Sequence, residues 1–196
     1  MKQRATTALK NQYKQILQFA RAKQSSEPVS NLYPWHCELA VTELMRHANS
    51  LQERQSTGSS STVRILTGTC PEHVYGNGAY EEFRTFLEKG GILKVLAWSA
   101  TPSKRTSKLA MLCDQFKSNA ELRVSKTVEK ANEIPHFLLV GEAAYRFEAP
   151  HEFVPAESFS DFYPEVPARI CFNDPSSGSE LKRFFDDIWG KCHPVE

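Results

Sequence analysis

The residues most able to do chemistry fall in a short segment that begins at His136. Apolar, β-prone residues on either side of a turn at Gly141 predict a hairpin, with the histidine at the start of its first strand. An imidazole in such a place can act as a nucleophile or transfer a proton near neutral pH. Tyr145, Arg146 and Glu148 fall on the second strand and are candidates for binding an anion or another ligand. The alternative is that His136 is an ordinary histidine at a strand start.

A second candidate ligand site lies in the loop after an expected strand over residues 62–67. His73 and Asn77 fall in this loop, and Gly76 and Gly78 flank the asparagine. In an open α/β sheet, such loops face the ligand crevice at the carboxyl ends of the strands. Free backbone N–H groups at the start of a helix can bind an anion there. The alternative is a plain loop in which Asn77 caps the next helix.

A basic stretch lies in the middle of the chain. Lys104, Arg105 and Lys108 stand near the start of an expected helix, and helical spacing places Lys104 and Lys108 on one face. Such a face can bind nucleic-acid phosphates without reading the base sequence. The alternative is an ordinary solvated helix face.

The composition is that of an ordinary folded protein. The 196 residues are 40% hydrophobic and 24% charged, enough for one sizeable core, and the net charge of +1 gives no overall attraction to nucleic acid or membrane. No window approaches the ~18 apolar residues that span a bilayer. The five cysteines are widely spaced, without a zinc-finger pattern. We therefore expect a cytoplasmic protein with reduced cysteines and no membrane partner, metal or cofactor.

Hydrophobic periodicity divides the chain into two parts near residue 60. Helices expected over residues 3–24 and from residue 34 onward make residues 1–60 an N-terminal helical extension. Strands then alternate with helices through residues 61–196, which predicts an α/β fold: a single sandwich with a mixed, mainly parallel sheet. The expected strands cover residues 62–67, 92–98, 121–125, the two arms of the hairpin and 168–172, and the expected helices begin at Asn77, Thr101 and Asp174.

The second part resembles one domain of the phospholipase D superfamily. The likeness covers residues 62–190, about two thirds of the chain, and rests on the order of elements and on a closing strand, Asn-Asp-Pro turn and helix ending in Phe and Trp. The family motif is H-x-K-x4-D, in which a histidine takes the phosphoryl group and the lysine neutralises its oxygens. His136 matches the histidine, but Leu138 and Ala143 stand at the lysine and aspartate positions. Loss of such a lysine lowers the catalytic rate by a factor on the order of 10²–10³.

The resemblance implies a catalytically degenerate domain that acts as a binding or regulatory subunit of a larger assembly. A protein partner is expected, and related domains also pair as homodimers across their active sites. Degenerate members resemble components of bacterial nuclease and phage-defence systems. Two alternatives remain: a phosphodiesterase or nuclease that uses His136 from two chains with Arg146 as the anion clamp, and a non-specific nucleic-acid-binding protein.

Overall fold

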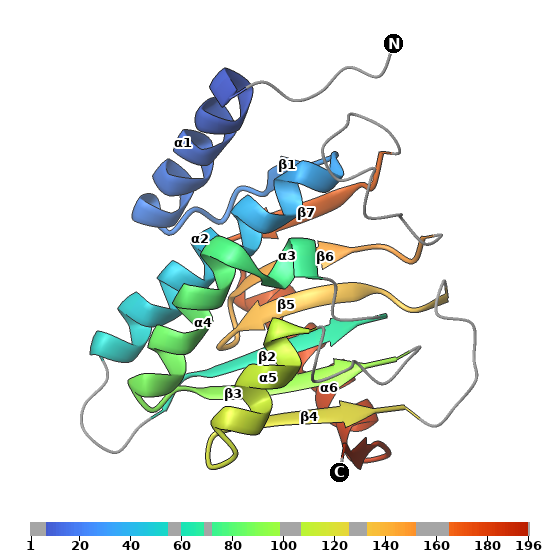
Figure 1. The fold of residues 1–196 in the computed structure, drawn as a ribbon. Helices are drawn as coiled ribbons and strands as arrows, with labels where there is room; N and C mark the ends of the chain where they lie inside the picture. Colours follow the sequence, from blue (N-terminus) through green and yellow to red (C-terminus); the bar gives the residue numbers. More distant parts are fainter. Residues whose placement is uncertain are drawn as a thin grey trace.

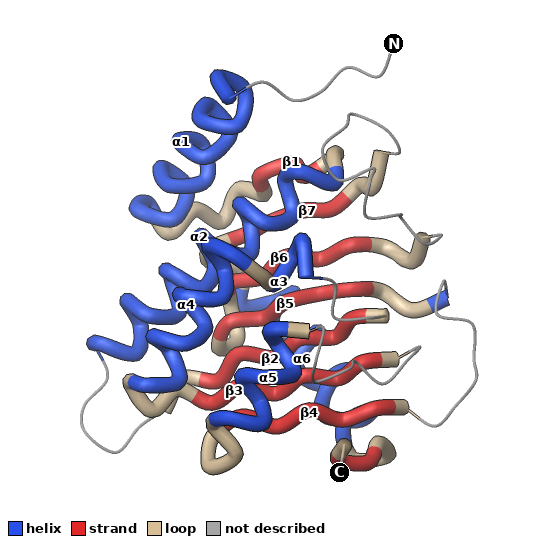
Figure 2. The backbone as a smooth tube through the Cα atoms, in the orientation of Figure 1, coloured by secondary structure: helices blue, strands red, loops and turns tan. Residues whose placement is uncertain are grey.

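The computed structural model describes residues 7–54, 60–68, 72–98, 107–125, 133–151 and 165–195. Within these ranges, eight strands form one mixed sheet in the order β1-β7-β6-β5-β2-β3-β4-β8 (Figure 1, Figure 2). The strands are β1 (Val29–Asn31), β2 (Thr62–Thr67), β3 (Ile92–Ala97), β4 (Ala120–Val124), β5 (His136–Val140), β6 (Ala144–Glu148), β7 (Ala168–Cys171) and β8 (His193–Pro194). The helices are α1 (Thr7–Lys23), α2 (Pro34–Arg54), α3 (Glu72–Tyr75), α4 (Asn77–Glu88), α5 (Lys108–Gln115) and α6 (Pro175–Trp189).

Parallel pairing among the described strands is confined to β2, β3 and β4, next to the β8 edge of the sheet. β3 pairs in parallel with β2 on one side and with β4 on the other. The remaining pairings among the described strands are antiparallel. The predicted α/β fold with a mixed sheet is therefore confirmed, although its parallel part is smaller than the majority we expected. The difference arises because the β5–β6 hairpin, β7 and the two edge strands all add antiparallel neighbours.

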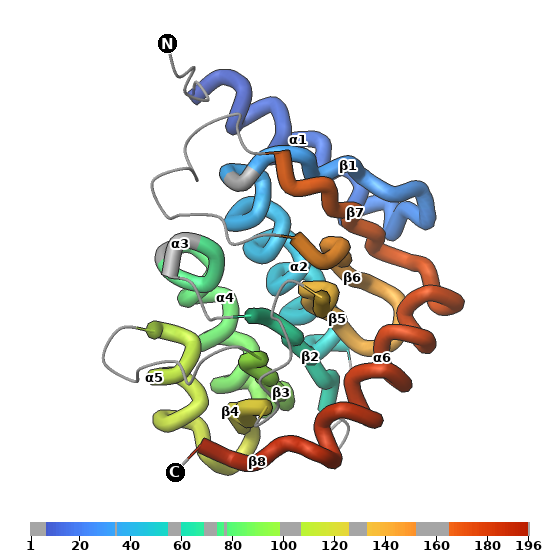
Figure 3. Tube along the Cα trace, turned by 90° about the vertical axis from the view of Figure 1, so that its right-hand side faces the viewer, coloured from blue at the N-terminus to red at the C-terminus, as the bar shows by residue number. Residues whose placement is uncertain are grey.

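Helices cover both faces of the sheet (Figure 3). α2, α4 and α5 lie on one face and α6 lies on the other, while α1 packs on α2. Successive residues of a strand point to opposite faces, so Leu138 and Val140 of β5 enter the core beneath α2, whereas Phe137 and Leu139 pack toward α6. His136 belongs to the same alternation as Leu138 and therefore lies on the α2 face.

Local signals set the start of α6 as predicted. The side chain of Asp174 accepts a hydrogen bond from the backbone N–H of Ser177 at 3.1 Å, and Pro175 stands in the first helical turn. Both features are favourable at a helix N-terminus, because a carboxylate satisfies a free N–H there and proline lacks the N–H that would be left unpaired.

Two other helix starts differ from the prediction. Gly76, not Asn77, is the N-cap of α4, and Asn77 is the first helical residue. α5 begins at Lys108 after Ser107, whose hydroxyl accepts from the N–H of Ala110 at 3.3 Å. The expected start at Thr101 lies outside the described residues. Strands β1 and β8 and helix α3 were not predicted, because strands of two or three residues and a helix of a single turn are too short to show a hydrophobic period.

The N-terminal part shares its core with the rest of the fold. Leu17 of α1 and Leu44 of α2 belong to the same buried cluster as Ile65 of β2, and β1 pairs with β7. The domain boundary near residue 60 stays a prediction. Among the described helices, none combines the length and the apolar character needed to cross a membrane.

His47 on α2 is expected to make the stability of the protein depend on pH. The side chain is 7% exposed and its ring lies 5.7 Å from that of Phe172. Burial, with a smaller effect of Arg21 and Arg54, lowers the pKa of His47 to about 4. The unfolded chain takes up this proton near pH 6.5, so stability is constant above that pH and falls as the pH drops toward 4.

We expect this histidine to contribute about 1–2 kcal/mol to that loss, allowing for solvent screening. Urea unfolding between pH 7.5 and 4 measures it, and His47→Gln should flatten the profile. His36 has a similarly lowered pKa of about 4, caused by burial and by Arg146, so part of the slope should remain. If His47→Gln loses as much stability as the parent between pH 7.5 and 4, His47 is not a source of the pH dependence.

Candidate functional site

The β5–β6 hairpin places His136 at the edge of the sheet where β2 ends. β5 runs antiparallel to β2 with Phe137 opposite Leu66, so the first residue of β5 lies beside the carboxyl end of β2. On the other side, His136 is directly opposite Glu148, the last residue of β6. Gly141, at φ 60°, adopts the left-handed conformation at the hairpin turn. The predicted hairpin is therefore confirmed, and its open end lies where α/β sheets commonly bind ligands.

Glu148 is the centre of a largely buried polar cluster. The residue is 5% exposed, and its Oε1 lies 3.6 Å from Nδ1 of His136 and also contacts Nε2 of His151. Its Oε2 pairs with the guanidinium of Arg146. Burial raises the pKa of this carboxyl, but Arg146 and the contacts from the two histidines outweigh burial and hold the pKa well below its ordinary range. Glu148 is therefore an anion at neutral pH, with one oxygen toward the histidines and one toward the arginine.

Arg146 is buried and bonded to groups from three elements. It is 6% exposed; its Nε donates to Oδ1 of Asn31 in β1 at 2.9 Å, and its Nη2 donates to Sγ of Cys37 in α2 at 2.8 Å. Burial works against its charge, but Cys37 and Glu148 outweigh burial and raise its pKa further. For the Cys37 thiol, burial has the opposite effect and raises the pKa to about 11, so the thiol is neutral at neutral pH. The guanidinium thus keeps its charge, and Glu148 neutralises it inside the protein.

The two ring nitrogens of His136 have different surroundings. Nδ1 faces the carboxylate of Glu148, whereas Nε2 is buried with no hydrogen-bond partner among the described residues. A carboxylate on one nitrogen orients an imidazole and leaves the other nitrogen for a ligand or a reacting group. The ring of His151 lies edge-on to that of His136, with 5.0 Å between centroids.

The position of the motif lysine is occupied by a core residue. Leu138 is buried and packs in the cluster beneath α2. Its cross-strand partner is Arg146, so a cation stands beside the lysine position but is already paired with Glu148. Ala143, at the aspartate position, lies in the hairpin turn, where its carbonyl accepts from the N–H of Asp174 at 2.8 Å.

Tyr145 is separated from the other candidate residues of the hairpin. It lies between Ala144 and Arg146 on β6 and faces the α6 side of the sheet, where its hydroxyl donates to Oδ2 of Asp174 at 2.8 Å. Of the predicted ligand-binding residues, the structure therefore brings Arg146 and Glu148 together with His136 and places Tyr145 on the opposite face.

The remaining candidate residues lie mostly outside the described part of the chain. His73 falls in α3 and Asn77 in α4, but the side chains of both are outside the described residues. Lys104 and Arg105 are outside them entirely. Lys108 is the first residue of α5, and its Nζ lies 5.8 Å from the ring centroid of Tyr80.

Three members of the cluster carried no usable signal in the sequence. In the sequence, Asn31 lies in a stretch with the Ser and Pro residues of a linker, Cys37 lies in the apolar stripe of the helix from residue 34, and His151 shows no ligand spacing with its neighbours. Their roles depend on β1, α2 and the end of β6 meeting in space. The sequence shows no metal-ligand spacing, so it did not predict the cluster of His136, Glu148 and His151. The ligand atoms of these three residues lie within 4.8 Å of one another.

No family model and no curated protein matches the chain by sequence. Its fold, however, is similar to that of several solved structures. NucT from Helicobacter pylori superposes with a TM-score of 0.60 at 10% identity, covering 86% of this chain and 99% of NucT. Nuc from Salmonella typhimurium, a phospholipase D family member, gives a TM-score of 0.50 at 13% identity, covering 87% and 99%.

TrmBL2, an archaeal chromatin protein with a novel mode of DNA binding, has a TM-score of 0.53 at 15% identity. That match covers 96% of this chain but only 63% of TrmBL2. At these identities the likeness concerns the fold. The chain adopts the mixed α/β fold of phospholipase D-like proteins.

Proposed function

We propose that the protein is a catalytically degenerate phospholipase D-like domain that acts as a binding or regulatory subunit of a nucleic-acid-associated assembly. The observation that carries the proposal is the buried pairing of Arg146 with Glu148 beside His136. Transfer of a phosphoryl group needs positive charge placed on its oxygens in the transition state. Leu138 supplies no charge, and the charge of Arg146 is already neutralised.

Releasing Arg146 to a phosphate is costly. Glu148 is buried, and removing one partner of a buried ion pair costs about 3–5 kcal/mol because the other charge is left uncompensated. Asn31 and Cys37 hold the same guanidinium on its other side. These bonds support a structural role for Arg146 rather than the role of an anion clamp.

The nucleic-acid setting rests on the fold neighbours. NucT, Nuc and TrmBL2 share the architecture, and TrmBL2 is a DNA-binding chromatin protein. We infer a cytoplasmic role with a protein partner, either a second copy or another component of the assembly, and a phage-defence system is one such setting. The basic stretch at Lys104, Arg105 and Lys108 is the candidate contact to nucleic acid.

We expect the purified protein to hydrolyse neither bis(p-nitrophenyl) phosphate nor single- or double-stranded DNA above background. The physical reason is the missing free cation at Leu138. The measurement is product release over hours, with His136→Ala as the site variant and His193→Ala, an exposed histidine on β8, as the matched control. Hydrolysis that His136→Ala abolishes and His193→Ala retains would overturn the proposal.

That outcome would instead support the second candidate function, a phosphodiesterase. The observation that favours it is the orientation of His136, with a carboxylate at Nδ1 and a buried Nε2 that has no hydrogen-bond partner within the described part of the chain. This is the arrangement of an activated nucleophile. A second copy of the chain would have to supply the other histidine.

A further inference from the structure

We infer that His136, Glu148 and His151 bind one divalent transition-metal ion of the zinc type. One ligand atom from each side chain lies within 4.8 Å of the other two. Two imidazoles and one carboxylate form a donor set that zinc takes in sites with three protein ligands and one open position. The inference goes beyond the proposed function, because a bound ion requires no catalysis.

The spacing of the ligand atoms suits a small ion. Ligands at ~2.0–2.1 Å from a tetrahedral zinc stand about 3.3 Å from each other. Nδ1 of His136 lies 3.6 Å from Oε1 of Glu148, and Nε2 of His151 contacts the same oxygen. The three ligand atoms are therefore within reach of one ion, and adjustment of the two imidazole rings would complete the site.

The surroundings of Glu148 also support metal binding. Arg146 holds Oε2, so the carboxylate is fixed with Oε1 toward the two histidines. Such an outer bond to a ligating carboxylate fixes its orientation and is a regular feature of metal sites. The charge of Arg146 opposes a second cation nearby, so we expect weaker binding than in a closed site with four protein ligands.

The position of the three residues gives the ion a structural effect. His136 begins β5, Glu148 ends β6, and His151 follows three residues later. A shared ion would tie the segment after β6 to the open end of the hairpin. Because an ion that binds only the folded state stabilises it by mass action, zinc should raise the melting temperature.

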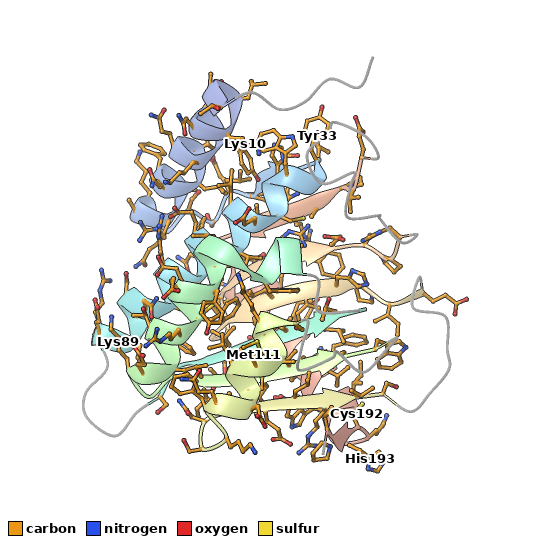
Figure 4. All side chains as sticks on the ribbon, viewed as in Figure 1. Lys10, Tyr33, Lys89, Met111, Cys192 and His193 are labelled. Atoms are coloured by element: carbon orange, nitrogen blue, oxygen red, sulfur yellow. The ribbon has the colours of Figure 1, made fainter. Side chains whose placement is uncertain are left out.

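The test is isothermal titration of the chelator-treated protein with zinc chloride, together with thermal unfolding in zinc and in chelator. We expect one equivalent of zinc per chain and a higher melting temperature with zinc. His151→Gln should weaken binding at least 10-fold and remove the temperature shift. His193→Gln is the matched control, because this exposed histidine lies at the β8 edge of the sheet (Figure 4), and it should bind zinc as the parent does.

Circular dichroism without metal shows whether each variant folds. If His151→Gln fails to fold, His136→Gln serves as the second site variant. Two results would overturn the inference: no zinc binding by the folded parent protein at 100 µM metal, or equal binding by the parent and the site variants. Both are readouts of binding, so they are independent of the hydrolysis assay that tests the proposed function.

Discussion

Glu148→Gln is expected to lower the free energy of unfolding by about 3–5 kcal/mol. Glutamine keeps the size of the side chain but removes the charge that neutralises Arg146, which is only 6% exposed. The guanidinium then remains buried among Asn31 and Cys37, neither of which carries a compensating charge at neutral pH. Urea unfolding followed by circular dichroism at pH 7.5, with a chelator present, measures the loss.

Two controls separate the buried charge from other effects. Glu88→Gln removes one partner of an exposed pair with Arg84, at 2.9 Å, and should change stability by less than about 0.5 kcal/mol. The double variant Arg146→Leu with Glu148→Leu leaves neither charge and should cost less than Glu148→Gln alone. A loss below 1 kcal/mol for Glu148→Gln, or a larger loss for the double variant, would contradict a tightly coupled buried pair.

Gly178→Ala is expected to destabilise the protein by about 3 kcal/mol through a clash between α6 and the hairpin. A Cβ at this position would lie 2.1 Å from the carbonyl oxygen of Glu142 and 2.9 Å from the backbone nitrogen of Ala143. These are backbone atoms of the β5–β6 turn, so they cannot rotate away. For a chain of this size, the expected fall in melting temperature is about 6–12 °C.

The direction of the stability change on replacing glycine by alanine shows whether the added Cβ meets other atoms. Replacing a helical glycine by alanine in open space stabilises a helix by up to about 1 kcal/mol. Gly190, at the other end of α6, has φ −64° and its nearest neighbour to an added Cβ is an Asp186 oxygen at 3.9 Å. Gly190→Ala should therefore leave the melting temperature unchanged or raise it. Equal behaviour of the two variants would mean that α6 does not pack closely on the hairpin turn.

The long elements could be predicted because each has its own local signal. β2 matches the predicted residues 62–67, and the hairpin matches its apolar arms and its turn at Gly141. Which side chains of an element are buried depends on how that element packs, and this was predicted less accurately. Helical spacing in the sequence of α6 favours Phe184 on the same inner face as Phe185 and Trp189, but the Phe184 side chain is 41% exposed, and Phe185 and Trp189 occupy the core.

The candidate site shows the same limit. Tyr145, Arg146 and Glu148 were predicted as neighbours of His136 because the hairpin is local, but strand alternation places Tyr145 on the opposite face. The bond from Arg146 to Asn31 joins residues 115 positions apart. Whether the guanidinium faces solvent or the core depends on that contact and on Cys37. No pattern within the hairpin carries this information, so the sequence alone left open whether the charge was available to a ligand.

The placement of β7 between β1 and β6 has a consequence for synthesis of the chain. Its pairing with β1 joins Val29 to Ile170, so that side of the sheet stays unpaired until most of the polypeptide has left the ribosome. During this interval β6 presents open hydrogen-bonding groups, and a nascent neighbour can pair with them. We therefore expect truncation before residue 168 to yield aggregates rather than a smaller folded protein, and production to improve at low temperature or with chaperones.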